Sequence, residues 1–323
     1  MSEDARAVAP SEIGGPAAIL AAAAALAWLS ATHPTWAPVW APWAFNWSQF
    51  LACTLSVWWY ARGVATLPPA ARPGLARQGA FLLGVTLIYA VLLTRFEYAA
   101  QHMFFLNRAQ HLAMHHLGPF LIALAWPGAA LARGMPAPLL RLIETRAVRH
   151  VMHAVQQPAL AAVLFAGLIG LWLMPSVHFR AMIDPRLYDV MNWSMVLDGV
   201  LFWCLVLDPR PAPPARTSYA VRLVITVAVM LPQIVLGAVI TFTTHALYPS
   251  YDLCGRLLPA IDALLDQHIG GSIVWIPGAM MSSVAFLLII NNMRRDEERS
   301  DGKTAIDAGD EPGTTFASGW TGR

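Results

Sequence analysis

Residues 219–243 read YAVRLVITVAVMLPQIVLGAVITFT, and this stretch decides the fold class. Arg222 is its single charged side chain, and the run exceeds the roughly 20 apolar residues that a helix needs to cross a bilayer. Lipid cannot satisfy an open backbone, so such a segment crosses as a helix with all its hydrogen bonds internal. We therefore predict a transmembrane α-helix here.

The whole chain has the same character. It is 57% hydrophobic and 12% charged, whereas soluble domains are about 25% charged, so a soluble enzyme domain is excluded. A net charge of +2 gives no electrostatic footprint for nucleic acid, and we expect no nucleic-acid partner. The three cysteines stand far apart without a CxxC pair, which predicts neither a zinc site nor a redox dithiol.

Further apolar runs follow the same pattern. We predict an all-α, polytopic transmembrane helix bundle of about eight helices, or seven if the first, a retained helix rather than a cleaved signal peptide, does not span. The bundle is expected over 15–291, between an N-terminal tail (1–14) and a charged, Gly-rich, disordered tail (292–323). The expected spans are 15–31, 45–61, 79–94, 109–131, 156–174, 189–207, 219–243 and 272–291.

Arginine placement orients these helices. If the N-terminus is cytoplasmic, the inner segments hold most of the 21 positive residues. Each inner loop then carries more positive residues than the outer loops on either side of it. Both termini are therefore predicted to be cytoplasmic. In that orientation most histidines fall at the outer side or in the outer halves of helices, whereas His150 and His153 fall inside.

The densest group of polar residues is QHMFFLNRAQHLAMHHLGPF, residues 101–120. On an α-helix His111 and His115 lie on one face about one turn apart, so they can share a metal ion. Imidazole and thioether together suit copper, although zinc is also compatible with imidazole. The alternative is that these histidines form hydrogen bonds between helices. The candidate ligands here are His102, His111, Met114, His115 and His116, with Asn107 supporting them.

A second group lies near the outer ends of the last two predicted helices. His245 and His268 are further candidate metal ligands there. Asp266 and Gln267 stand at a helix entry, where a carboxylate caps the helix or orients an imidazole. Asp198, at membrane depth, needs a partner, and a hydrogen bond inside the bundle is the plain explanation. No GxSxG, Walker or HExxH pattern occurs, so we expect a protein that is not an enzyme.

Four segments together resemble the CtaG family of cytochrome c oxidase assembly factors, over roughly residues 45–291. They are RAQHLAMHHLGPFLIALAWPG (108–128), PRLYDVMNWSMVLDGVLFW (185–203), LGAVITFTTHALYPSYD (236–252) and DQHIGGSIVWIPG (266–278). The resemblance implies a multi-pass protein of the bacterial plasma (inner) membrane that helps to assemble haem–copper oxidase. Asn107 and Leu173 stand where the family's pattern has histidine.

The resemblance also implies a copper cargo on the outer face. The expected partners are membrane lipid and either a haem–copper oxidase subunit or a copper chaperone. We expect a shallow site with few ligands, because transfer requires exchange. Two alternatives stay open: a transporter for copper or another small solute, and a haem-binding membrane electron carrier.

Overall fold

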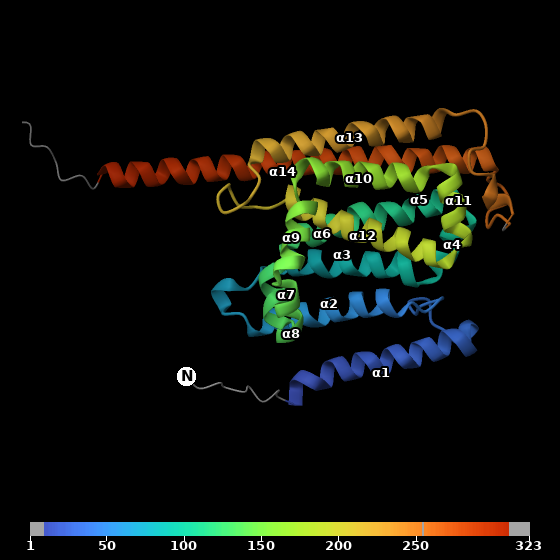
Figure 1. Ribbon diagram of the computed structural model, residues 1–323, viewed down its shortest axis with the longest axis horizontal. Helices are drawn as coiled ribbons and strands as arrows, with labels where there is room; N and C mark the ends of the chain where they lie inside the picture. Colours follow the sequence, from blue (N-terminus) through green and yellow to red (C-terminus); the bar gives the residue numbers. More distant parts are fainter. Residues whose placement is uncertain (1–9, 254, 310–323) are drawn as a thin grey trace, which may run out of the picture.

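The computed structural model describes residues 10–253 and 255–309, and within these ranges the chain is built from helices without strands (Figure 1). The all-α prediction is therefore confirmed. The α-helices are α1 (Pro10–Thr32), α2 (Trp47–Thr66), α3 (Leu75–Leu93), α4 (Arg95–His102), α5 (Phe104–His111), α6 (Gly118–Ala125), α7 (Gly128–Gly134), α8 (Ala137–Ile143), α9 (Arg146–Val155), α10 (Pro158–Leu173), α11 (Pro175–Ile183), α12 (Pro185–Val206), α13 (Tyr219–Phe242) and α14 (Ala263–Gly309). A π-helix, η3 (Leu112–Leu117), joins α5 to α6, and short 3-10 turns occupy η1 (Pro34–Trp36), η2 (Pro69–Ala71) and η4 (Pro249–Asp252).

Five helices of the described chain are long and apolar enough to cross a membrane, and two bent helix pairs raise the number to as many as seven. The five lie in α1, α3, α12, α13 and α14. The expected span at 45–61 corresponds to α2, which is not among them and carries polar residues such as Gln49. A multi-pass helix bundle is thus confirmed, whereas a count of eight spans and the direction of the termini stay predictions.

The two bent pairs are sharp turns of the chain, and the first of them shortens a span expected from the sequence, whereas the expected span 156–174 corresponds to α10. After α6 the chain turns by 81° into α7, through Trp126 with a φ of 50° and Pro127. Proline cannot continue the α6 hydrogen-bond ladder, so the expected span 109–131 ends earlier, at Ala125. Similarly, α9 meets α10 at 72° just before Pro158.

Small residues allow the last two long helices to pack closely. A Cβ on Gly271 of α14 would lie 2.7 Å from the Thr241 backbone nitrogen of α13, and one on Gly237 would lie 2.7 Å from the Trp275 side chain. Glycine at these positions removes that clash and allows the backbones to approach. Gly271 and Gly237 therefore form a close contact between α13 and α14.

The first and last helices of the described chain pack differently against the bundle. Helix α1 lies along one flank and packs against α2, while α14 runs through the bundle and projects beyond it (Figure 1). Disorder was expected from residue 292, but α14 is helical to Gly309. Ion pairs Arg294–Glu298 (3.5 Å) and Asp296–Arg299 (3.3 Å) lie one turn apart and support the helix. The rest of both predicted tails lies outside the described residues.

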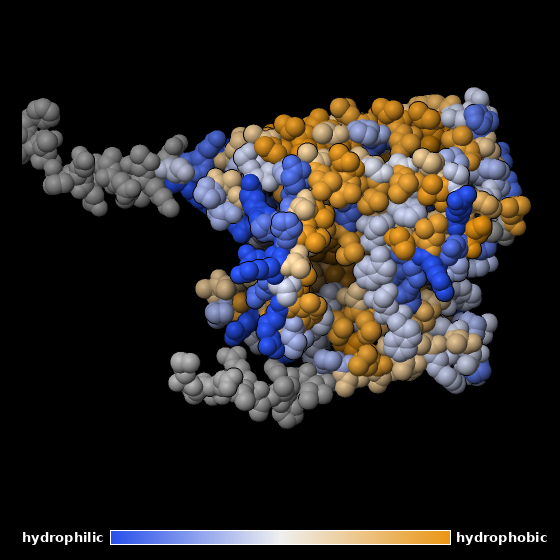
Figure 2. Space-filling view, in the orientation of Figure 1, coloured by the Kyte–Doolittle hydropathy of each residue, from blue (hydrophilic) through white to orange (hydrophobic). Residues whose placement is uncertain are grey.

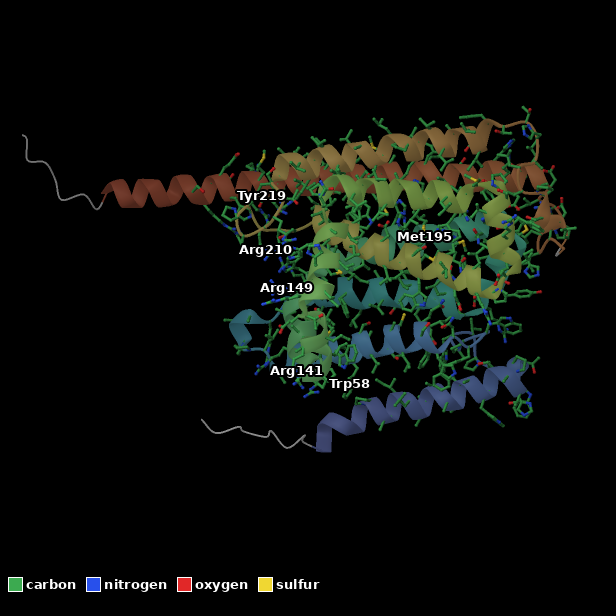
Figure 3. All side chains as sticks on the ribbon, in the orientation of Figure 1. Trp58, Arg141, Arg149, Met195, Arg210 and Tyr219 are labelled. Atoms are coloured by element: carbon green, nitrogen blue, oxygen red, sulfur yellow. The ribbon has the colours of Figure 1, made fainter. Side chains whose placement is uncertain are left out.

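The surface has an apolar middle and a basic end. Figure 2 shows apolar residues over most of the face, with one group of hydrophilic residues near α8 and α9 and another toward the opposite end, near α4 and α11. Figure 3 places Arg141, Arg149 and Arg210 at the end near α8 and α9, whereas Met195 of α12 lies well inside the length of the bundle. This clustering agrees with the loops predicted to be cytoplasmic.

Candidate functional site

The π-helix η3 places adjacent histidines in the centre of the bundle. It widens the turn between α5 and α6, and it contains His115 and His116, both buried. From Phe104 to Ala125 the segment has a length of about 33 Å at 1.5 Å per residue, and His115 stands about 16 Å along it. The histidine pair therefore lies midway through the expected membrane, deeper than the shallow site that the sequence suggested.

Glycine brings α12 against this π-helix. A Cβ on Gly199 would lie 2.3 Å from the backbone oxygen of His115, so only glycine fits at this crossing. The close approach aligns the two helices. Tyr188 of α12 donates its hydroxyl to Gln110 Oε1 at 3.2 Å, and further along Asp198 Oδ2 lies 3.1 Å from His115 Nε2.

A chain of buried polar groups runs across three helices. His115 Nδ1 lies 3.2 Å from His116 Nδ1, and His116 Nε2 lies 3.3 Å from Gln233 Oε1 of α13. Asp198 ends the chain at His115, which confirms the bundle-internal partner expected for this carboxyl group. The adjacent imidazoles contact each other and two different helices, as hydrogen-bonding residues inside a membrane protein do.

Donor and acceptor roles along this chain are linked. If His116 donates Nε2–H to Gln233, its neutral ring accepts at Nδ1 from His115. His115 Nε2 is then an acceptor, and a protonated Asp198 donates to it. If the Gln233 amide is turned over, every bond reverses and Asp198 becomes an ionised acceptor. The two arrangements differ by one proton, and in both of them all four ring nitrogens are engaged.

His111 differs from its neighbours because neither ring nitrogen has a hydrogen-bond partner, although the residue is only 6% exposed. It faces a cavity of about 30 Å³, which it shares with Arg108 and with Met195 of α12. The Arg108 Nε is also buried and unpartnered, and its Nη2 donates to the Asn107 side-chain oxygen. The remaining lining residues are Leu112, His115, His116, Ile169, Ile273 and Val274.

The other predicted ligands lie elsewhere. Met114 is fully buried but does not line the cavity, whereas Met195 does. His102 and His268 are partly exposed, and each bonds to a backbone carbonyl, of Tyr98 (2.7 Å) and Thr243 (3.1 Å) respectively. His245 is exposed. The structure thus brings His111, His115 and His116 together, and leaves the second histidine group outside their cavity.

Asp266 and Gln267 accept hydrogen bonds from backbone amides and do not orient imidazole rings. Asp266 accepts from the backbone nitrogens of Phe104 (2.9 Å) and Phe105 (2.7 Å), so it caps α5 instead of its own helix. Arg256 Nη1 donates to the same carboxylate at 2.7 Å. Gln267 accepts from Leu247 N at 2.6 Å. Asn107 contacts Met182 Sδ at 3.8 Å and supports Arg108 rather than a histidine.

Asp198, Arg108, Gln233 and Met195 complete the site, and only Asp198 stood out in the sequence as a group that needs a partner. Gln233 carried a weak signal, because it is an amide within the apolar stretch 219–243. Within residues 10–253 and 255–309, no three His, Cys, Asp or Glu side chains are placed to hold a metal ion by themselves. A metal bound here would need the thioether.

His178 on α11 is a structural residue. Its Nδ1 donates to the Trp172 carbonyl (3.0 Å), and its Nε2 accepts from the Tyr251 hydroxyl (2.8 Å). Burial, together with the positive charge of Arg108, lowers the pKa of His178 to about 3. The ring is therefore neutral at physiological pH and joins α11 to the loop that follows α13.

Comparison with known proteins shows that the chain matches a protein family. The cytochrome c oxidase caa3 assembly factor family matches residues 58–296, which include every residue of the cavity. An uncharacterized protein of Mycobacterium leprae (strain TN) is 24% identical over 233 residues, covering 67% of this chain. The chain spans 33% of that relative's length. No solved structure matches the chain.

Proposed function

The chain belongs to the cytochrome c oxidase caa3 assembly factor family, and from this premise we propose that it handles copper during assembly of the haem–copper oxidase. In this proposal it works as a multi-pass protein of the bacterial plasma membrane, without catalysing a reaction. It receives Cu(I) from the outer face and passes it to an oxidase subunit or a copper chaperone. The copper ion is its cargo.

The observation that carries the proposal is the unpartnered His111 ring beside Met195 in one buried cavity. A neutral imidazole supplies a nitrogen lone pair, and thioether sulfur favours Cu(I) over harder ions. Two ligands hold Cu(I) loosely enough for exchange. His115 and His116 use their ring nitrogens within the polar chain, so in the proposal they support the site without binding the ion.

The register of α5 and α12 supports a second sulfur as a candidate ligand beside this histidine. Gln110 pairs with Tyr188, and His115 pairs with Asp198, so His111 stands beside the α12 segment between these two pairs. Met191 lies on that segment, one turn before Met195, and both side chains are fully buried. Met191 is therefore a candidate third ligand or the preceding step of an entry route from the outer end.

The two alternatives fit the geometry less well. A haem group needs far more room than a cavity of about 30 Å³. A copper transporter needs ligands toward the basic end, and there both ring nitrogens of His153 already contact the Arg216 guanidinium. Proteoliposome uptake of copper would favour the transporter over the proposal.

A Cu(I) competition titration tests the proposal on the purified full-length protein in detergent, in chloride-free buffer, against a chromophoric Cu(I) chelator. We expect about one Cu(I) per chain, with His111→Ala and Met195→Leu each weakening binding at least tenfold. The matched control is His102→Ala, which removes a partly exposed imidazole at the outer end and should bind copper normally. Equal binding by His111→Ala and the unmodified protein would reject the copper site.

The assembly role needs a separate measurement in cells. In a strain that lacks this gene, complementation with His111→Ala should give oxidase with reduced copper content, whereas His102→Ala should restore it. Oxidase with normal copper in the His111→Ala strain would contradict the transfer step even if copper binds in vitro.

A further inference from the structure

Arg108 is a buried positive charge whose surroundings do not neutralise it. The residue is 3% exposed, on the part of α5 that enters the bundle. Its guanidinium lies 5.1 Å from the centre of the Phe104 ring, and its Nη2 donates to the neutral side chain of Asn107. Its Nε has no partner. Buried charges in proteins are normally paired, so this one indicates a missing negative partner.

The nearby carboxyl groups are already engaged. Asp266 binds the first amides of α5 and pairs with Arg256 at 2.7 Å. Asp198 pairs with His115 at 3.1 Å. Across the described residues, none of the ion pairs includes Arg108. Among the described residues, therefore, no carboxylate balances the charge of Arg108.

The cavity supplies the space and a second donor. Arg108 and His111 line the same cavity of about 30 Å³, room for roughly two water-sized groups. A neutral His111 has one N–H, and neither of its nitrogens is bonded within the protein. Apolar side chains such as Ile169 and Val274 form other walls, and a low dielectric strengthens the attraction of a guanidinium for an anion.

We propose that this cavity binds one small monovalent anion of the size of chloride, held by the Arg108 guanidinium and by an N–H of His111. Water would fill the space and accept a hydrogen bond, but it would leave the charge of Arg108 unbalanced. The anion uses one nitrogen of His111 and leaves the other nitrogen free. Anion binding thus does not require copper, and it is compatible with the copper proposal.

Equilibrium dialysis with radioactive chloride tests the site on the purified full-length protein in detergent, with gluconate as the background anion. We expect about one chloride per chain for the unmodified protein and at least tenfold weaker binding for Arg108→Gln. Arg180→Gln is the matched control, because Arg180 is an exposed arginine on α11. Arg108→Gln binding chloride as tightly as the unmodified protein would overturn the proposal.

A second measurement serves if Arg108→Gln fails to fold. The thermal midpoint of the unmodified protein should be higher in chloride than in gluconate at equal ionic strength. Absence of both chloride uptake and this shift would mean that the cavity holds only water, and would overturn the proposal. Met195→Leu separates the two sites, because it should lose Cu(I) and keep chloride.

Discussion

The histidines of the outer end and those of the central cavity share a side chain but differ in their surroundings. His102 and His268 are partly exposed and donate to backbone carbonyls of their own neighbourhood. His115 and His116 are buried and bond to side chains of other helices, and His111 is buried with both nitrogens unpartnered. Removing an outer imidazole breaks one partly exposed hydrogen bond. Removing a central imidazole, in contrast, leaves other buried polar groups without hydrogen-bond partners.

The strongest way to break this comparison is to remove His115. We expect His115→Ala to lower the free energy of unfolding by about 3–5 kcal/mol, because Asp198 loses its buried partner. His268→Ala should cost less than about 1 kcal/mol, since its hydrogen bond is partly exposed. Chemical denaturation of both variants in detergent measures the difference.

A double variant checks the cause of that loss. His115→Leu combined with Asp198→Leu removes both polar partners, and apolar replacement of a buried pair is often close to neutral. It should be more stable than His115→Ala. A double variant as unstable as the single one would mean that ring packing, for example on Phe165, dominates.

Gly199 offers a smaller test of how the central site is held. Gly199→Ala places a Cβ 2.3 Å from the His115 backbone oxygen and should cost about 1–3 kcal/mol as α12 is pushed away. The control is Gly167→Ala on α10, where a Cβ meets nothing within 4 Å. That control should be neutral or stabilising, because alanine favours helix. Equal losses in the two variants would argue against close packing at Gly199.

The smallest expected effect belongs to the outer region and depends on pH. Burial, together with the negative charge of Asp189, raises the pKa of Glu97 on α4 to about 8. A carboxyl that binds its proton more tightly when folded stabilises the protein at low pH, and this contribution is lost as pH rises from about 4.5 to 8. Because Glu97 is only half-buried and solvent screens its charge, we expect a loss well below the full linkage value, roughly 1 kcal/mol or about 2–4 °C in thermal midpoint.

Glu97→Gln is the matched variant because it keeps the shape without the titration. Its thermal midpoint should change less between pH 5 and pH 8 than that of the unmodified protein. His178, whose pKa is lowered to about 3, contributes a slope of the opposite sign below about pH 6.5, but this slope is the same in both proteins and cancels in the comparison. Identical pH slopes for the two proteins would contradict the role of Glu97.

Apolar runs predicted most of the fold, because a segment in lipid must satisfy its backbone hydrogen bonds internally and therefore forms a helix. The runs 189–207 and 219–243 correspond closely to α12 and α13. The bend before α7 was missed, since apolar character continues through it while Pro127 redirects the chain; the expected span 156–174, in contrast, corresponds to α10, and the bend after α9 precedes it. The helix beyond residue 291 was missed because composition indicated disorder, whereas its charges are spaced for ion pairs within a helix.

The candidate site was only partly predictable. The four-residue spacing of His111 and His115 identified them as candidate ligands, because it places both side chains on one face of a helix. Arg108 and Met195 were not among the predicted ligands, although both line the cavity. Their importance depends on which helices meet, and a single sequence does not contain that pairing. The lack of partners at His111 is likewise a property of the packed bundle.

The π-helix at Leu112–Leu117 has one more consequence. The extra residue in its wide turn sets the rotational phase between α5 and α6. On the N-terminal side of the π-helix, Gln110 forms hydrogen bonds with Val91 and Tyr188. On the C-terminal side, Gly118 packs closely against Gly84 of α3. Deleting a single residue such as Ala113 would rotate one half of the span by about 100° relative to the other. Both halves could then no longer face their neighbours at once, so the length of this segment is as constrained as its chemistry.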